Sequence, residues 1–124
     1  MSKKNNLIMA IDDSKTMLNI IAFAIDDMGY KTVKACDGRE ALDFLLKEEV
    51  RMIVTDFHMP AMDGLELIRK IRSSGANTTT PILVLSTNNE KDKIQEAKDL
   101  GASGWIIKPF SREKLQNVIK EVCD

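Results

Sequence analysis

Five polar residues stand where this chain could do chemistry. Asp12 and Asp13 directly follow the first apolar run of the sequence, and Asp56 directly follows the third. Ser86 closes the fourth run, and Lys108 comes directly after the fifth. If these runs are parallel strands of one sheet, the five side chains meet at one edge, outside the carboxyl ends of the strands.

Three carboxylates in one place repel one another, and without a cation at least one would take up a proton. Mg²⁺ removes this conflict, because it prefers a few carboxylate or carbonyl oxygens and keeps waters that a phosphate oxygen can replace. A carboxylate beside Mg²⁺ can also attack phosphorus and form an acyl phosphate. The hydroxyl of Ser86, the ammonium of Lys108 and backbone N–H groups after Asp56 would then donate to the phosphoryl oxygens.

Each of these residues also has a purely structural interpretation. The acidic pair after the first run, with Ser14, could cap a helix. Asp56 could be a loop residue before a turn, and Lys108 could be solvated. Ser86 and Thr87 could cap the next helix. The functional interpretation is favoured because all of these groups follow strands at the same edge.

The elements that must position these residues follow from the hydrophobic pattern. Short apolar runs alternate with amphipathic segments, which indicates an α/β fold. Gly29 ends the first helix and Asp37 caps the second. The expected strands are residues 7–11, 32–36, 52–55, 82–86 and 105–107. The apolar residues at helical spacing are Met17, Ile20, Ile21, Ala24 and Met28, then Ala41, Leu42 and Leu45, then Leu65, Ile68 and Ile71, then Ile94, Ala97 and Leu100, and finally Leu115, Val118, Ile119 and Val122.

Nearly continuous apolar strands, each followed by a helix, predict a parallel sheet that is covered on both faces. Five strands are too few to close an eight-stranded barrel. Right-handed crossovers leave few other topologies, so we expect an open, doubly wound, three-layer sheet.

Composition limits the classes of function. The chain has 124 residues, 44% of them hydrophobic, and 18 Lys+Arg against 19 Asp+Glu. This predicts one domain over residues 1–124 rather than a two-domain enzyme, and neither a nucleic acid nor a membrane as partner. The two cysteines and single histidine form no zinc constellation, and the sequence has no Walker or GxGxxG loop for a nucleotide. The absence of a signal segment predicts a cytoplasmic protein.

Three segments carry a family resemblance. MAIDDS at residues 9–14, TDFHMPAMDG at 55–64 and GASGWIIKPF at 101–110 together resemble the receiver domain of two-component response regulators, over essentially the whole chain. The resemblance implies a flavodoxin-like sheet with strand order 2-1-3-4-5, an order that is carried over from the family and that the apolar pattern alone leaves open.

The resemblance also implies roles for individual residues. Asp56 would be the phosphoacceptor, and Lys108, in a cis peptide with Pro109, would pair with the phosphoryl group. The Mg²⁺ ligands would be Asp12, Asp13, Asp56 and the backbone carbonyl of His58. The side chains of His58 and Asn88 would flank the same site, where they can influence loss of phosphate.

The family's switch would work through Ser86 and Trp105. Phosphorylation adds about −1.5 to −2 charges at Asp56, and the new oxygens would attract Ser86 and Lys108. Trp105 would then turn into the vacated space, through a shift between two pre-existing conformers. The surface formed by the fourth helix, fifth strand and fifth helix would change for a partner that contacts Lys91, Ile94, Trp105 and Phe110.

The expected function is therefore a signalling switch, a monomer phosphorylated by a sensor histidine kinase, and not a conventional enzyme. Only Asp124 follows the last predicted helix, so no output domain is expected. The segment at 101–110 looks most like single-domain chemotaxis regulators, which suggests a flagellar motor switch protein as the target. A phosphorelay intermediate and a piece of a longer regulator remain alternatives.

Two alternatives come from other classes of protein. An aspartate-nucleophile phosphohydrolase would use the same metal and acyl phosphate, but it usually has two aspartates one residue apart after the first strand. A flavin-binding protein of similar topology would want a Ser/Thr/Gly-rich loop there, and Asp12 and Asp13 would repel its phosphate.

Overall fold

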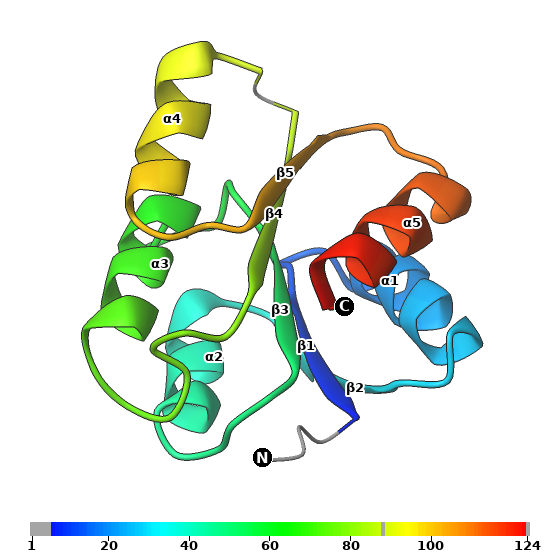
Figure 1. Ribbon diagram of the computed structural model, residues 1–124, viewed down its shortest axis with the longest axis horizontal. Helices are drawn as coiled ribbons and strands as arrows, with labels where there is room; N and C mark the ends of the chain where they lie inside the picture. Colours follow the sequence, from blue (N-terminus) through cyan, green and yellow to red (C-terminus); the bar gives the residue numbers. More distant parts are fainter. Residues whose placement is uncertain (1–5, 88, 124) are drawn as a thin grey trace.

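The computed structural model describes residues 6–87 and 89–123, so Asn88 lies outside the described residues. Five parallel strands form one sheet in the order β2-β1-β3-β4-β5, which confirms the predicted topology (Figure 1). The strands are β1 (Leu7–Ile11), β2 (Lys31–Ala35), β3 (Met52–Asp56), β4 (Ile82–Ser86) and β5 (Gly104–Ile107). The helices are α1 (Lys15–Asp27), α2 (Gly38–Leu45), α3 (Gly64–Ser73), α4 (Lys91–Asp99) and α5 (Arg112–Cys123).

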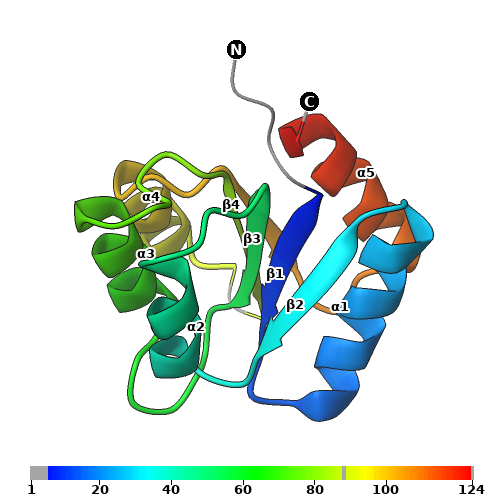
Figure 2. The ribbon, with the colours of Figure 1, turned by 90° about the horizontal axis from the view of Figure 1, so that it is seen from below.

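Helices cover both faces of the sheet, as expected. α1 and α5 lie on one face, and α2, α3 and α4 lie on the other (Figures 1 and 2). Successive side chains of a strand point to opposite faces, so each strand supplies both layers. In β3, for example, Ile53 joins the cluster under α2 and α3, while Met52 and Val54 join the cluster under α1 and α5.

Helix starts follow the predicted capping chemistry. The carboxylate of Asp37 accepts from the Glu40 N–H at 2.8 Å at the start of α2. Ser14 caps α1 by accepting from the Met17 N–H. The N-cap position of α4 is occupied by Glu90, so the idea that Ser86 and Thr87 cap this helix is wrong.

Strand boundaries differ from the prediction by one residue in three of the strands. β2 covers Lys31–Ala35 instead of 32–36, because the Cys36 N–H donates to the Glu40 carboxylate at 2.7 Å. β3 includes Asp56, since the next N–H still donates to the Leu85 carbonyl. β5 starts at Gly104, which pairs with β4 but has no side chain to extend the apolar pattern.

The predicted inner faces of the helices are mostly confirmed. Ile20 is the clear error, because it is 47% exposed beside the exposed Phe23. The buried stripe of α1 instead runs through Leu18, Ile21 and Ile25. α4 is the most weakly buried helix: of its residues, all of which the structure describes, only Ala97 is buried.

Side-chain hydrogen bonds to backbone carbonyls stabilise the end of the sheet where the strands begin, opposite their carboxyl ends. The buried Asn77 amide donates to the Leu45 and Glu48 carbonyls and accepts from the Val50 N–H at 3.0 Å. The guanidinium of Arg72 donates to the carbonyls of Asn77, Thr78 and Gly101. These bonds tie the ends of α2 and α4 to the loop before β4. Among the described residues, no helix has the length and apolar character needed to span a membrane.

Replacing Gly101 by alanine should destabilise the fold more than the same change at Gly29. Both glycines follow helices with positive φ, at +111° and +92°, where a side chain costs roughly 1–2 kcal/mol. A Cβ at residue 101 would also lie 2.6 Å from Nε of Arg72, whereas one at residue 29 meets nothing within 4 Å. Urea unfolding should therefore place Gly101→Ala below Gly29→Ala by about 1 kcal/mol or more. Equal stabilities would show that Arg72 moves aside freely.

Candidate functional site

The three predicted aspartates meet at the carboxyl ends of β1 and β3. Ile11 pairs with Thr55 across these strands, so the residues that follow them, Asp12 and Asp56, lie side by side. One carboxylate oxygen from each of Asp12, Asp13 and Asp56 lies within 4.8 Å of the others. Asp12 and Asp56 are buried, while Asp13 is exposed. The convergence predicted from strand ends is therefore present.

Asp12 is fixed by its local backbone. Its N–H continues the ladder to β2 by donating to the Ala35 carbonyl, and its Oδ1 accepts from the Ser14 N–H at 2.9 Å. Its Oδ2 is buried and has no hydrogen-bond partner among the described residues. Burial is the main reason that the pKa of Asp12 lies above its usual value. The neighbouring Asp56 and Asp13 raise this pKa further, against the lowering effects of the Ser14 N–H and of Lys108.

Lys108 points into this carboxylate cluster. Its Nζ lies 2.9 Å from Oδ1 of Asp56 and 3.6 Å from Oδ2 of Asp12. Its backbone N–H donates to the Ser86 carbonyl at 2.7 Å, and its peptide bond to Pro109 is cis, as the family resemblance implied. One ammonium group cannot balance the charge of three ionised carboxylates, so the site would attract a further positive charge.

Ser86 lies at the same edge as the aspartates. It is the last residue of β4 and is fully buried, and in the adjacent register Leu85 pairs with Asp56. The next hydroxyl along the chain, Thr87, is exposed. Of these two side chains, Ser86 is therefore the one enclosed by the fold at the aspartate end of the sheet.

The loop after Asp56 carries two aromatic residues with opposite surroundings. His58 is exposed, whereas Phe57 is buried beneath it with the two rings edge to face at 4.8 Å. The loop closes where the Gly64 N–H donates to the Phe57 carbonyl at 2.8 Å. Phe57 also contacts Trp105 of β5, with ring centroids 5.1 Å apart.

The structure brings the predicted partner surface together only in part. Trp105 and Phe110 line one surface hollow at the β5 edge, although Trp105 packs toward α4 and Phe110 toward α5. Lys91 and Ile94 lie on α4 and do not line that hollow. Trp105 is half-buried, so the ring is only partly accessible.

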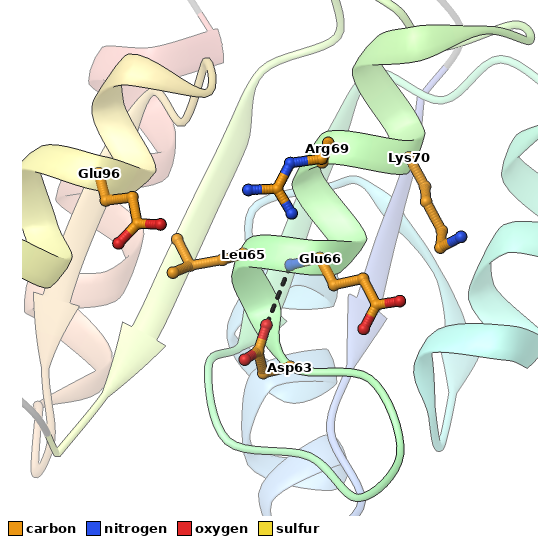
Figure 3. A pocket seen from close by; sticks show the side chains of 6 residues that line it. All are labelled: Asp63, Leu65, Glu66, Arg69, Lys70 and Glu96. Carbon is orange, nitrogen blue, oxygen red and sulfur yellow. Dashed lines mark hydrogen bonds between the residues drawn. The ribbon is translucent and has the colours of Figure 1, made fainter.

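A second concave region is lined by residues of α3 and its N-cap together with Glu96 of α4, and none of the three aspartates of the acidic cluster lines it (Figure 3). Figure 3 shows Asp63 using its carboxylate to accept from the Glu66 N–H, as the N-cap of α3. The remaining polar residues there are exposed and of both signs. This groove therefore has the character of a solvated surface, and none of the predicted site residues lines it. The lining residues are Asp63, Leu65, Glu66, Arg69, Lys70 and Glu96.

The acidic cluster fits Mg²⁺ on its own chemistry. It offers oxygen donors from three carboxylates close enough to share one ion, and Mg²⁺ is a hard cation that selects such donors. The buried Oδ2 of Asp12 lacks a hydrogen bond within the described part of the chain, and a bound cation would compensate this oxygen.

Sequence reasoning missed several residues that hold the fold or the loop after Asp56 in place. Asn77 and Arg72 act through bonds to backbone carbonyls of distant segments, which leave no local pattern. Phe57 lies within a recognised motif, but the motif alone does not place its ring in the core. Its alternation with Ile53 and Thr55 on one face of β3 is the signal that could have done so.

Comparison with known proteins agrees with this geometry. Residues 8–120 match the family model described as the response regulator receiver domain. The chain is 34% identical over 122 residues to chemotaxis protein CheY-3 of Vibrio cholerae, covering 98% of this chain and 94% of the relative. It is 34% identical over 118 residues to chemotaxis protein CheY of Pseudomonas aeruginosa, covering 94% and 95%.

Solved structures show the same likeness. Chemotaxis response regulator CheY4 of Vibrio cholerae superimposes with a TM-score of 0.89 at 36% identity, covering 97% of this chain and 99% of the other. The Francisella response regulator 1452 receiver domain gives a TM-score of 0.87 at 28% identity, covering 96% and 97%. With its strand order, its acidic edge and its match to the family model, this chain belongs to the response regulator receiver domain family.

Proposed function

We propose that this protein is a phosphorylation-activated switch of a two-component system, acting in chemotaxis as a monomer in the cytoplasm. The observation that carries the proposal is the buried Asp56 carboxylate, which contacts Lys108 at 2.9 Å beside two further carboxylates. The proposal treats residues 1–124 as a single receiver domain. The chemotaxis setting is supported by relatives at 34% identity that are named as chemotaxis proteins.

In the proposed reaction, Asp56 takes a phosphoryl group from a phosphohistidine of a sensor kinase. A carboxylate oxygen of Asp56 forms a bond to phosphorus while the phosphorus–nitrogen bond breaks, and the leaving imidazole keeps the electron pair and takes up a proton. Lys108 lies within reach of the new phosphoryl oxygens because it already contacts Asp56. The charge-assisted hydrogen bond that it donates would stabilise the negative charge of the transferring group.

Mg²⁺ would be held by the carboxylates of Asp12, Asp13 and Asp56 and by the backbone carbonyl of His58. When bound, it would supply the positive charge that the cluster lacks and that phosphoryl oxygens require. The chain's own contribution is to hold these oxygens in place before the reaction. Burial and the hydrogen bond from the Ser14 N–H fix the orientation of Asp12.

The switch would begin when phosphoryl oxygens attract Ser86 and Lys108. Ser86 is a buried hydroxyl at the end of β4, so its displacement would move the segment that leads to α4. α4 buries little apolar surface, so a shift of this helix would cost less free energy than a shift of the other helices. Trp105 would turn with it, and a target such as a flagellar motor switch protein would contact Lys91, Ile94, Trp105 and Phe110.

Substituting Asp56→Asn should abolish phosphorylation. Incubated with Mg²⁺ and acetyl phosphate, the wild-type protein should gain one phosphoryl group by mass spectrometry, and Asp56→Asn should gain none. Beryllofluoride with Mg²⁺ should change the fluorescence of Trp105, the single tryptophan, in the wild type alone. Asp63→Asn is the matched control, because Asp63 is an exposed helix cap. Phosphorylation of Asp56→Asn at the wild-type level would contradict the assignment.

Substituting Ser86→Ala should separate phosphorylation from switching. The variant should still accept phosphate, since Asp56 and Lys108 are intact, but its Trp105 fluorescence should respond less to beryllofluoride. Thr87→Ala removes the neighbouring exposed hydroxyl and should behave as the wild type. A full response in Ser86→Ala would exclude the buried hydroxyl as the moving group.

Substituting Asp12→Asn should stabilise the metal-free protein. The raised pKa of Asp12 means that its ionised form costs folding free energy at neutral pH, and an amide retains the acceptor for Ser14. We expect a gain of about 1 kcal/mol, or roughly 3–5 °C in melting temperature. The gain should shrink in acid, where the folded protein protonates Asp12 first.

Added Mg²⁺ should stabilise the wild type by mass action and Asp12→Asn much less. Asp13→Asn, at an exposed position, is the control for charge removal and should give a smaller gain without metal. A lower melting temperature for Asp12→Asn in chelator would refute the argument.

A further inference from the structure

Phe57 connects the phosphoacceptor loop to β5 through two ring contacts. Its ring meets the exposed His58 edge to face, with centroids 4.8 Å apart and an interplanar angle of 89°. On its other side it meets Trp105, with centroids 5.1 Å apart and an angle of 50°. Phe57 directly follows Asp56 in the chain, whereas Trp105 lies on the edge strand of the sheet. The three rings therefore form a continuous contact from the site to the β5 edge.

The position of Phe57 is fixed on several sides. Its side chain is only 4% exposed. Its N–H donates to the Leu85 carbonyl at 2.9 Å, one residue before Ser86, and its carbonyl accepts from the Gly64 N–H at 2.8 Å. A Cβ at Gly64 would lie 3.0 Å from Cδ1 of the ring, so α3 packs directly against it. A closely packed side chain transmits a displacement of its backbone, because no free space absorbs it.

Two movements at the site would reach Phe57 directly. A phosphoryl group on Asp56 would displace the peptide unit that joins Asp56 to Phe57. Any shift of Ser86 would also pull on the Leu85 carbonyl to which the Phe57 N–H donates. Tilted and edge-to-face ring pairs are favourable only over a limited range of geometries, so a shift of Phe57 changes which orientations of Trp105 are favourable.

We propose that Phe57 is a positioning residue that couples occupancy of the Asp56 site to the orientation of Trp105 by direct ring contact. This inference rests on the proposed phosphoacceptor function and assigns it a second route, separate from the attraction between Ser86 and the phosphoryl group. The route through Phe57 acts by packing of aromatic rings, whereas the route through Ser86 acts by a hydrogen bond to the phosphoryl group.

The test compares Phe57→Leu with Phe44→Leu. Both remove a phenylalanine ring that packs in the same apolar cluster, but Phe44 lies on α2 and its ring contacts neither His58 nor Trp105 among the ring pairs of the described residues. Acrylamide quenching measures the accessibility of Trp105 with and without beryllofluoride and Mg²⁺. Mass spectrometry measures phosphoryl uptake from acetyl phosphate in the same samples.

We expect Phe57→Leu to take up the phosphoryl group within a few-fold of the wild-type rate but to lose at least half of the wild-type change in Trp105 quenching. Phe44→Leu should keep both. If circular dichroism shows that Phe57→Leu is unfolded, Phe57→Met replaces it with a longer apolar side chain and the same expectation.

The outcomes separate the two proposals. A wild-type change in quenching in a folded, phosphorylated Phe57 variant would overturn the coupling role and leave the phosphoacceptor function standing. The same loss of response in Phe44→Leu would also overturn it, because removal of any ring in this cluster would then have the same effect on Trp105. Absence of phosphoryl uptake by the wild-type protein would contradict the proposed function and, with it, the coupling.

Discussion

The repulsion among three carboxylates at one sheet edge is the constraint on which the rest of the molecule depends. Parallel pairing of β1 with β3 forces Asp12 and Asp56 together, and Lys108 supplies too little charge to offset them. Burial sharpens the conflict, as the raised pKa of Asp12 shows. Oδ2 of Asp12 is buried without a hydrogen bond in the described structure, with only the Lys108 ammonium at 3.6 Å to offset its charge. This unbalanced negative charge favours binding of a cation at the cluster.

The two ends of the sheet are built from different kinds of interaction. At the end away from the aspartates, the neutral amide of Asn77 and the cationic guanidinium of Arg72 donate to backbone carbonyls of several segments. At the aspartate end the contacts are ionic, and among the residues of α4, all of which are described, only Ala97 is buried. In the proposed switch, movement would therefore be confined to the aspartate end, since the bonds at the other end do not involve the charged groups of the site.

Much of the fold and the candidate site could be predicted because both follow from local patterns. Apolar runs located the strands, and polar residues at their ends located Asp12, Asp56 and Lys108. Side-chain bonds between distant segments could not be predicted this way. The Glu40 carboxylate ended β2 early by binding the Cys36 N–H, and no apolar periodicity reports such a bond. The contact between Phe57 and Trp105 also depends on how β3 and β5 are placed, which is a property of the finished sheet.

The sparse burial of α4 has a consequence for how such a protein can diverge. Ala97 is the one buried residue of α4, a helix that the structure describes in full, so substitutions on the exposed face of this helix should carry little folding cost, and none of them lies in the acidic cluster. If α4 forms part of the proposed target surface, its sequence could change with the target while the proposed phosphoacceptor residues stay the same, and duplicated copies of this gene could then acquire separate signalling routes through changes that include this short segment.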